Sequence, residues 1–102
     1  MKYQLVLQLS ASTIEDYDVL VDLENELIRR LGTIGCVDGH DAGSGEMNIF
    51  ILTDEPLQTF NLMREFSCVH RLLDDLKVAY REIGGDSFTI LHPAGLKHFA
   101  VA

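Results

Sequence analysis

The stretch from Thr33 to Thr53, TIGCVDGHDAGSGEMNIFILT, constrains the fold most, because its two halves differ in character. The first half is polar and has glycines at positions 35 and 39, which is typical of a strand at a sheet edge. The second half, MNIFILT, is almost continuously apolar and suits a strand in the middle of a sheet. The sequence therefore predicts a hairpin, with its tip at Gly43-Ser44 or Ser44-Gly45.

Two regular patterns precede this hairpin. Residues 3 to 9, YQLVLQL, alternate and predict a strand with one buried face. Residues 13 to 31 predict a helix that begins at a capping box, in the register 12–15 or 13–16. The apolar positions that share one face of this helix are Ile14, Tyr17, Leu20, Val21, Leu27, Ile28 and Leu31.

A second helix is predicted to follow the segment TDEPL, with Asp54 as its cap and Pro56 in its first turn. We expect it to end near Asp75, because a helix that continued to residue 83 would overhang a sheet of short strands. Residues 76–83 and 86–93 then form two strands around Gly84-Gly85. Residues 72–83 also fit a helical repeat, which leaves a helix as the alternative for this segment.

The predicted order is β-α-β-β-α-β plus an extra C-terminal strand, in a single α+β domain over residues 1–102. This is the ferredoxin-like, or split β-α-β, arrangement. Its first and third strands are central and its second lies at an edge, which agrees with the apolar and polar character of the predicted strands. Both helices would cover one face of an antiparallel sheet and leave the other face open.

Two segments, VDGHDAGSGEMNIFI and VAYREIGGDSFTILHP, resemble a family of small, uncharacterised bacterial proteins. The resemblance covers most of the chain after residue 30 and supports a hairpin over residues 76–92. It implies a ferredoxin-like α+β fold. No established activity comes with this family, so it implies no catalytic residues.

Composition narrows the classes of function. The net charge is −8, with 8 Lys and Arg against 16 Asp and Glu, which argues against a broad basic face for nucleic acid or an anionic membrane. The first ten residues do not have the pattern of a secretory signal. Two cysteines, Cys36 and Cys68, make no disulfide framework, and we expect both to be small apolar fillers in a cytoplasmic protein.

The hairpin carries four polar residues that could bind a ligand, Asp38, His40, Asp41 and Glu46, near Phe50. They do not match the calcium-loop pattern, and zinc sites usually need more His or Cys at set spacings. We therefore predict no metal and no cofactor, and favour a solvated turn, with contact to a ligand or partner as the alternative. With a loop over residues 42–45, Asp41 would lie opposite Glu46, and these like charges would repel.

Glu24 is the unexpected residue of the first helix, because the helical pattern places it at the centre of the apolar stripe. A buried carboxylate needs a partner or a proton. His70, at the margin of the apolar arc of the second helix, is the partner that we predict. The alternative is that Glu24 reaches water past the end of the sheet or meets a lysine.

The open sheet face is the third candidate. It would carry Gln4, Val6, Gln8, Asn48, Phe50 and Leu52. A half-apolar face of this kind is covered by the extra strand and tail, by a ligand or by a second copy of the chain. Homodimerisation is the interpretation that we favour.

The sequence thus predicts a small cytoplasmic, non-catalytic binding or regulatory module that is homodimeric. One alternative is a compact enzyme that uses His40 with Asp38 or Asp41, or Glu24 with His70, as an acid/base pair. Another is an acidic immunity- or inhibitor-type protein that docks a basic enzyme. Its marker would be an exposed row formed by Glu15, Asp18, Asp22 and Glu26.

Overall fold

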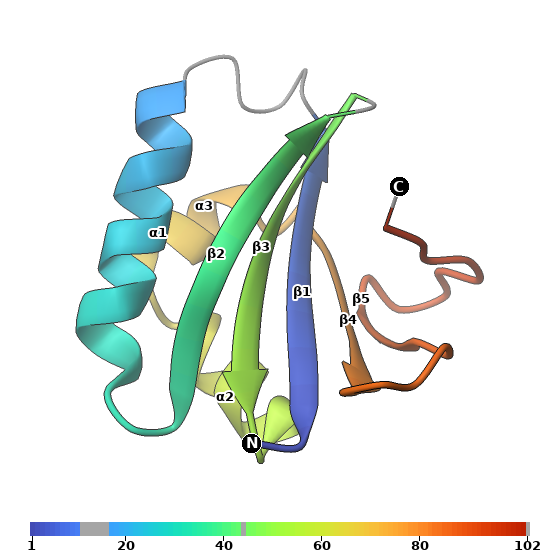
Figure 1. Ribbon diagram of the computed structural model, residues 1–102. Helices are drawn as coiled ribbons and strands as arrows, with labels where there is room; N and C mark the ends of the chain where they lie inside the picture. The colour runs from blue at the N-terminus through green and yellow to red at the C-terminus, as the bar shows by residue number, and fades with distance from the viewer. Residues whose placement is uncertain (11–16, 44, 102) are drawn as a thin grey trace.

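Five antiparallel strands form one sheet, in the order β2-β3-β1-β4-β5, and three helices lie on one of its faces (Figure 1). This computed structural model describes residues 1–10, 17–43 and 45–101. The elements are β1 (Tyr3–Ser10), α1 (Tyr17–Leu31), β2 (Gly35–Gly43), β3 (Glu46–Thr53), α2 (Pro56–Met63), α3 (Ser67–Leu72), β4 (Lys77–Glu82) and β5 (Thr89–His92).

The predicted strands are present, although the last one, predicted over residues 86–93, covers only Thr89–His92. β1 and β3 pair along their whole length in the interior of the sheet, and the polar β2 is at its edge. Residues 76–83 contribute a strand, β4, rather than the continuation of a helix. The capping box at 12–15 or 13–16 and the hairpin tip at Ser44 lie outside the described residues.

The second helix is not the single helix that the sequence predicts over about 55–75. It is divided into α2 and α3, and Phe66 between them is extended, with φ −72° and ψ 131°. No glycine or proline marks the break. The Phe66 side chain is buried and the guanidinium of Arg30 lies 4.4 Å from the centre of its ring, so tertiary packing holds the turn. The element order is therefore β-α-β-β-α-α-β-β and not strictly the predicted one.

A single apolar core fills the space between the helices and the sheet. It contains Leu5, Leu7 and Leu9 of β1, Ile49 and Ile51 of β3, Val78 of β4, and Leu20, Leu23, Leu27 and Leu31 of α1. The buried stripe of α1 is rotated from the predicted one, because Leu23 is buried whereas Ile28 is 57% exposed. Glu24 consequently lies at the margin of the stripe and not at its centre.

Two buried threonines join the end of β3 to the start of α2. Thr53 Oγ1 donates to Ile34 O and accepts from the backbone N–H of Glu55, at 2.8 and 3.0 Å, and it lies 2.8 Å from Thr59 Oγ1. The N-cap of α2 is Glu55 and has no side-chain cap hydrogen bond, so the prediction of Asp54 as the cap is wrong. Asp54 Oδ1 accepts instead from the backbone N–H of Lys2, at 2.9 Å.

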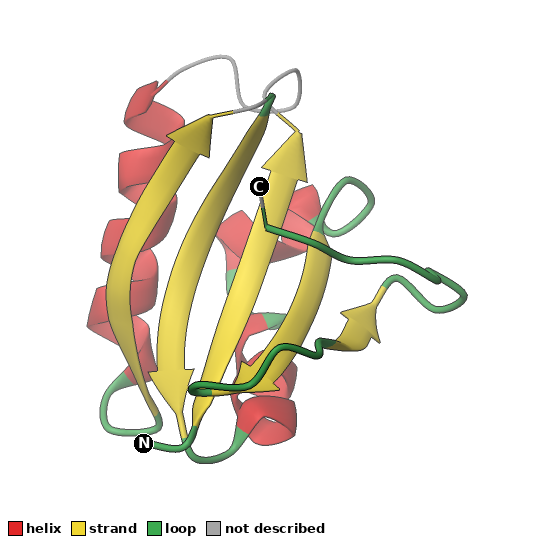
Figure 2. Cartoon of the chain, turned by 45° about the vertical axis from the view of Figure 1, so that its right-hand side comes forward, coloured by secondary structure: helices red, strands yellow, loops and turns green. Residues whose placement is uncertain are grey.

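The C-terminal segment, residues 83–101, adds β5 to the edge of the sheet and otherwise crosses the sheet face that the helices leave open (Figure 2). The ring of Phe88 packs on that of Phe99, with 4.9 Å between the centroids, and Gln8 Nε2 donates to Ala100 O at 2.8 Å. Arg81 donates to Gln4 Oε1 and to Gly85 O, at 3.0 and 2.9 Å, which attaches the turn after β4 to the same face. The face predicted to be open is thus partly covered by the chain itself.

None of the described helices is long and apolar enough to cross a membrane.

Candidate functional site

A β-bulge in β2 decides where the polar residues of the hairpin lie. Val37 pairs with Ile51 and Gly39 with Phe50, so Asp38 has no partner in the register. Asp38 is exposed, and the next residue, Gly39, has a φ of +120° that side chains rarely adopt. Bulges and charges of this kind block the pairing of an edge strand with other chains.

The remaining hairpin carboxylates do not converge on His40. Asp41 lies opposite Asn48, and Glu46 opposite Gly43, so the predicted repulsion between Asp41 and Glu46 across the hairpin does not arise. Both carboxylates are on the sheet face away from the helices, whereas His40 pairs with the core residue Ile49. Among the described residues, no three His, Cys, Asp or Glu side chains are grouped so that they could hold a metal ion.

His40 faces α1 and pairs there with Glu24. Its Nδ1–H donates to Glu24 Oε2 at 2.9 Å, and the two side chains are 26% and 15% exposed. The carboxylate can only accept, which fixes the proton on Nδ1. Glu24 thus pairs with a histidine, but this histidine lies on the edge strand β2. His70, the partner predicted for it, is exposed on α3.

Glu26 occupies the opposite flank of α1, beside α3. The Cys68 thiol lies beside its carboxylate. Burial raises the pKa of Cys68 from 9.0 to about 11, and a hydrogen bond to Glu26 and the negative charge of Glu26 act in the same direction. Glu26 Oε1 has no hydrogen-bond partner within the described part of the chain, and Arg30 Nη1 is 3.8 Å from it.

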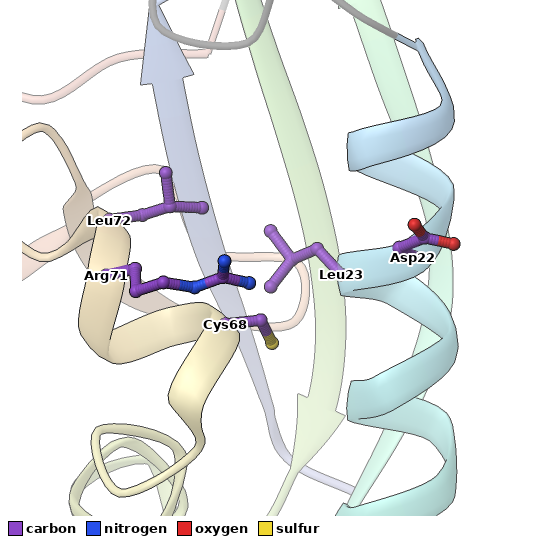
Figure 3. Close-up of a pocket in the computed structure, with 5 residues that line it drawn as sticks. All are labelled: Asp22, Leu23, Cys68, Arg71 and Leu72. Carbon is purple, nitrogen blue, oxygen red and sulfur yellow. The ribbon is translucent and has the colours of Figure 1, made fainter.

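A cavity of about 350 Å³ opens between α1 and α3 next to this pair. It is lined by Asp22 and Leu23 of α1 and by Cys68, Arg71 and Leu72 of α3. Figure 3 shows Arg71 and Cys68 pointing from α3 toward Leu23, with the Asp22 carboxylate on the outer side of α1. The wall is mainly apolar, and the charged side chain of Arg71 extends across the cleft toward Leu23.

The part of the sheet face that the C-terminal segment leaves free lies over β2 and β3 (Figure 2). Register places Leu52 beside Cys36 and Phe50 beside Gly39 on that face. We call these four residues the β2–β3 strip. Phe50 and Leu52 are half-buried, Cys36 is exposed, and a Cβ at Gly39 would meet no atom within 4 Å. By contrast, Val6 of β1 and Ala79 of β4, which continue the row of cross-strand neighbours from Gly39 and Phe50, are fully buried.

Two predictions about single side chains need correction. Cys36 is exposed and does not fill a core position. Glu26 is only 19% exposed, so it does not belong to a solvated acidic row on α1, although Asp22 is exposed as predicted. Glu15 and the side chain of Asp18 lie outside the described residues.

Comparison of the chain with protein-family models, with curated proteins and with solved structures finds no match.

Proposed function

We propose that the protein is a small cytoplasmic binding module that acts as a homodimer through the β2–β3 strip. It is built on a ferredoxin-like unit, β1-α1-β2-β3-α2-β4, to which α3 and β5 are added. The position of β1 and β3 inside the sheet and of β2 at its edge supports this inference. The observation that carries the proposed function is the uncovered apolar strip on an otherwise covered sheet face.

The strip suits a second copy of the chain because none of its four residues is charged. Two chains with a net charge of −8 repel each other, and contact through uncharged surfaces adds least to this repulsion. A two-fold axis would bring the same strip on each copy together. A stable dimer buries about 800 Å² on each partner, so neighbouring parts of β2 and of the C-terminal segment would form the rim.

The exposed carboxylates of Asp38 and Asp41 flank the strip on β2. In a symmetric dimer they would add like charges at the rim, and salt would screen their repulsion. Asp38 and Asp41 would thus determine how association depends on salt. Phe50 would lie at the centre of the contact between the two copies.

Replacement of Phe50 tests the proposal. We expect the wild-type mass in solution to be that of two chains, and Phe50→Asp to raise the dissociation constant roughly thirtyfold or more, as central aromatic residues do. Sedimentation equilibrium at several protein and salt concentrations measures this. Leu57→Asp is the matched control, because Leu57 is 58% exposed on α2, behind the sheet. A wild-type monomer at all concentrations, or equal dissociation by Leu57→Asp, would contradict the proposal.

The Glu24–His40 pair is the observation that favours the second candidate, an enzyme with acid/base chemistry. Its atoms are in hydrogen-bond range, as such chemistry requires. Neither residue lines the cavity between α1 and α3 or the two cavities that Tyr3 lines. We therefore place the binding module first.

A further inference from the structure

We propose that the cleft between α1 and α3 binds a small aliphatic monocarboxylate, whose head group pairs with Arg71 and whose chain packs on Leu23 and Leu72. The inference does not depend on the proposed dimer. The cleft is on the helix side of the sheet, and the β2–β3 strip is on the other side.

The size and wall of the cleft indicate a small molecule with an apolar body. Its volume of about 350 Å³ falls within the usual range of ligand pockets. Leu23 forms a fully buried floor, and Leu72 a half-buried wall. Cys68 adds a neutral surface, since its raised pKa keeps the thiol protonated near pH 7.

The charges at the rim select the head group. Arg71 is exposed and forms no ion pair with any side chain in the described ranges, so its guanidinium can receive an anion. A carboxylate is planar and accepts two parallel hydrogen bonds from a guanidinium. This pairing would be made at the mouth of an apolar cleft, where it is less screened than in open water.

The neighbouring carboxylates exclude other classes of ligand. Asp22 lines the cleft, and Glu26 lies beside the thiol of Cys68. Two negative charges near the cleft would repel a phosphate or any other multiply charged anion more strongly than a single carboxylate. Arg71 would repel an alkyl ammonium ion. A single carboxylate on an apolar chain is the chemistry that remains.

Octanoate is the probe that tests the site. In an amide NMR titration of the full chain, we expect the largest shifts at Asp22, Leu23, Cys68, Arg71 and Leu72. Octanamide, which has the same chain without the charge, should bind about tenfold more weakly. Shifts that cluster elsewhere, no saturable binding of octanoate, or equal binding of octanamide would overturn the proposal.

Two arginine variants separate the site from the general effect of charge. Arg71→Gln should weaken octanoate binding about tenfold. Arg64→Gln makes the same change at an exposed arginine that packs on Phe60 and does not line the cleft, and it should leave the affinity unchanged. Equal effects of the two variants would overturn the proposal.

A third variant, Cys68→Phe, fills the cleft and should abolish octanoate binding; wild-type affinity in this variant would overturn the proposal. Circular dichroism shows whether it folds, and if it does not, the Arg71 variant decides. Phe50→Asp should bind octanoate as the wild type does. These experiments therefore distinguish a failure of the proposed dimer from a failure of the proposed carboxylate site.

Discussion

The two flanks of α1 carry glutamates only two residues apart, and the two carboxylates have different partners. Glu24 meets His40 of β2 at 2.9 Å, in a direct pair between a helix and an edge strand. Glu26 meets the Cys68 thiol of α3, and its two arginine neighbours are each 3.8 Å away. The first carboxylate thus joins the helix to the edge strand through a short hydrogen bond, whereas the second mainly changes the chemistry of its neighbour.

The largest expected effect is on the β2 flank. Glu24→Ala should lower the free energy of unfolding by about 2 kcal/mol, because it removes a hydrogen bond with a charged acceptor in a mostly buried place. Asp22→Ala, at an exposed carboxylate of the same helix, should change it by less than about 0.5 kcal/mol. Urea denaturation measures both changes. Similar losses of stability in the two variants would show that the hydrogen bond between Glu24 and His40 does not stabilise the fold.

The Cys68 thiol on the α3 flank should affect the free energy of unfolding at alkaline pH. The pKa of Cys68 is raised in the folded state, so the unfolded state loses its proton first. Stability is therefore fully present below about pH 9 and is lost as the pH rises toward about 11. After allowance for solvent at this half-exposed side chain, the loss is on the order of 1 kcal/mol.

Comparison with Cys68→Ala isolates this loss from the titration of lysines and tyrosines. The difference in unfolding free energy between wild type and variant should shrink between those two pH values. A difference that does not change with pH would mean that the thiol titrates alike in both states.

The smallest expected effect on stability belongs to Glu26→Gln, at less than about 0.5 kcal/mol. Its ion pairs are long and its arginines are exposed, so little is lost. The variant should nevertheless lower the pKa of Cys68 toward 9.0, because the charge of Glu26 is removed. Ultraviolet absorbance of the thiolate reports this in a Cys36→Ser background. A destabilisation as large as that of Glu24→Ala would contradict the proposed difference between the two flanks of α1.

The sequence predicts the sheet well because alternation and turn residues are local signals. The apolar β1 and β3 and the glycine-rich β2 lie where their composition places them. The break at Phe66 could not be found in this way, since it depends on the cation of Arg30 and on the core rather than on a local breaker.

The site was harder to predict because helix rotation and bulges are set by distant contacts. The helical pattern places Ile28 in the buried stripe and leaves out Leu23, whereas α3 packs on the flank that buries Leu23. The bulge at Asp38 then brings His40 to the side of α1. The sequence predicts His70 as the partner of Glu24, whereas the bulge places His40 beside Glu24.

The contact between Gln8 and Ala100 has a consequence for the order of folding. The two residues are 92 positions apart, so their hydrogen bond closes almost the whole chain into a loop. The entropy cost of such a closure grows with the length of the loop, and contacts of this kind form after the local ones. The hairpin of β2 and β3 can form early. We therefore expect the C-terminal segment to dock after the hairpin, and Val6 and Ala79 to be less covered until it does.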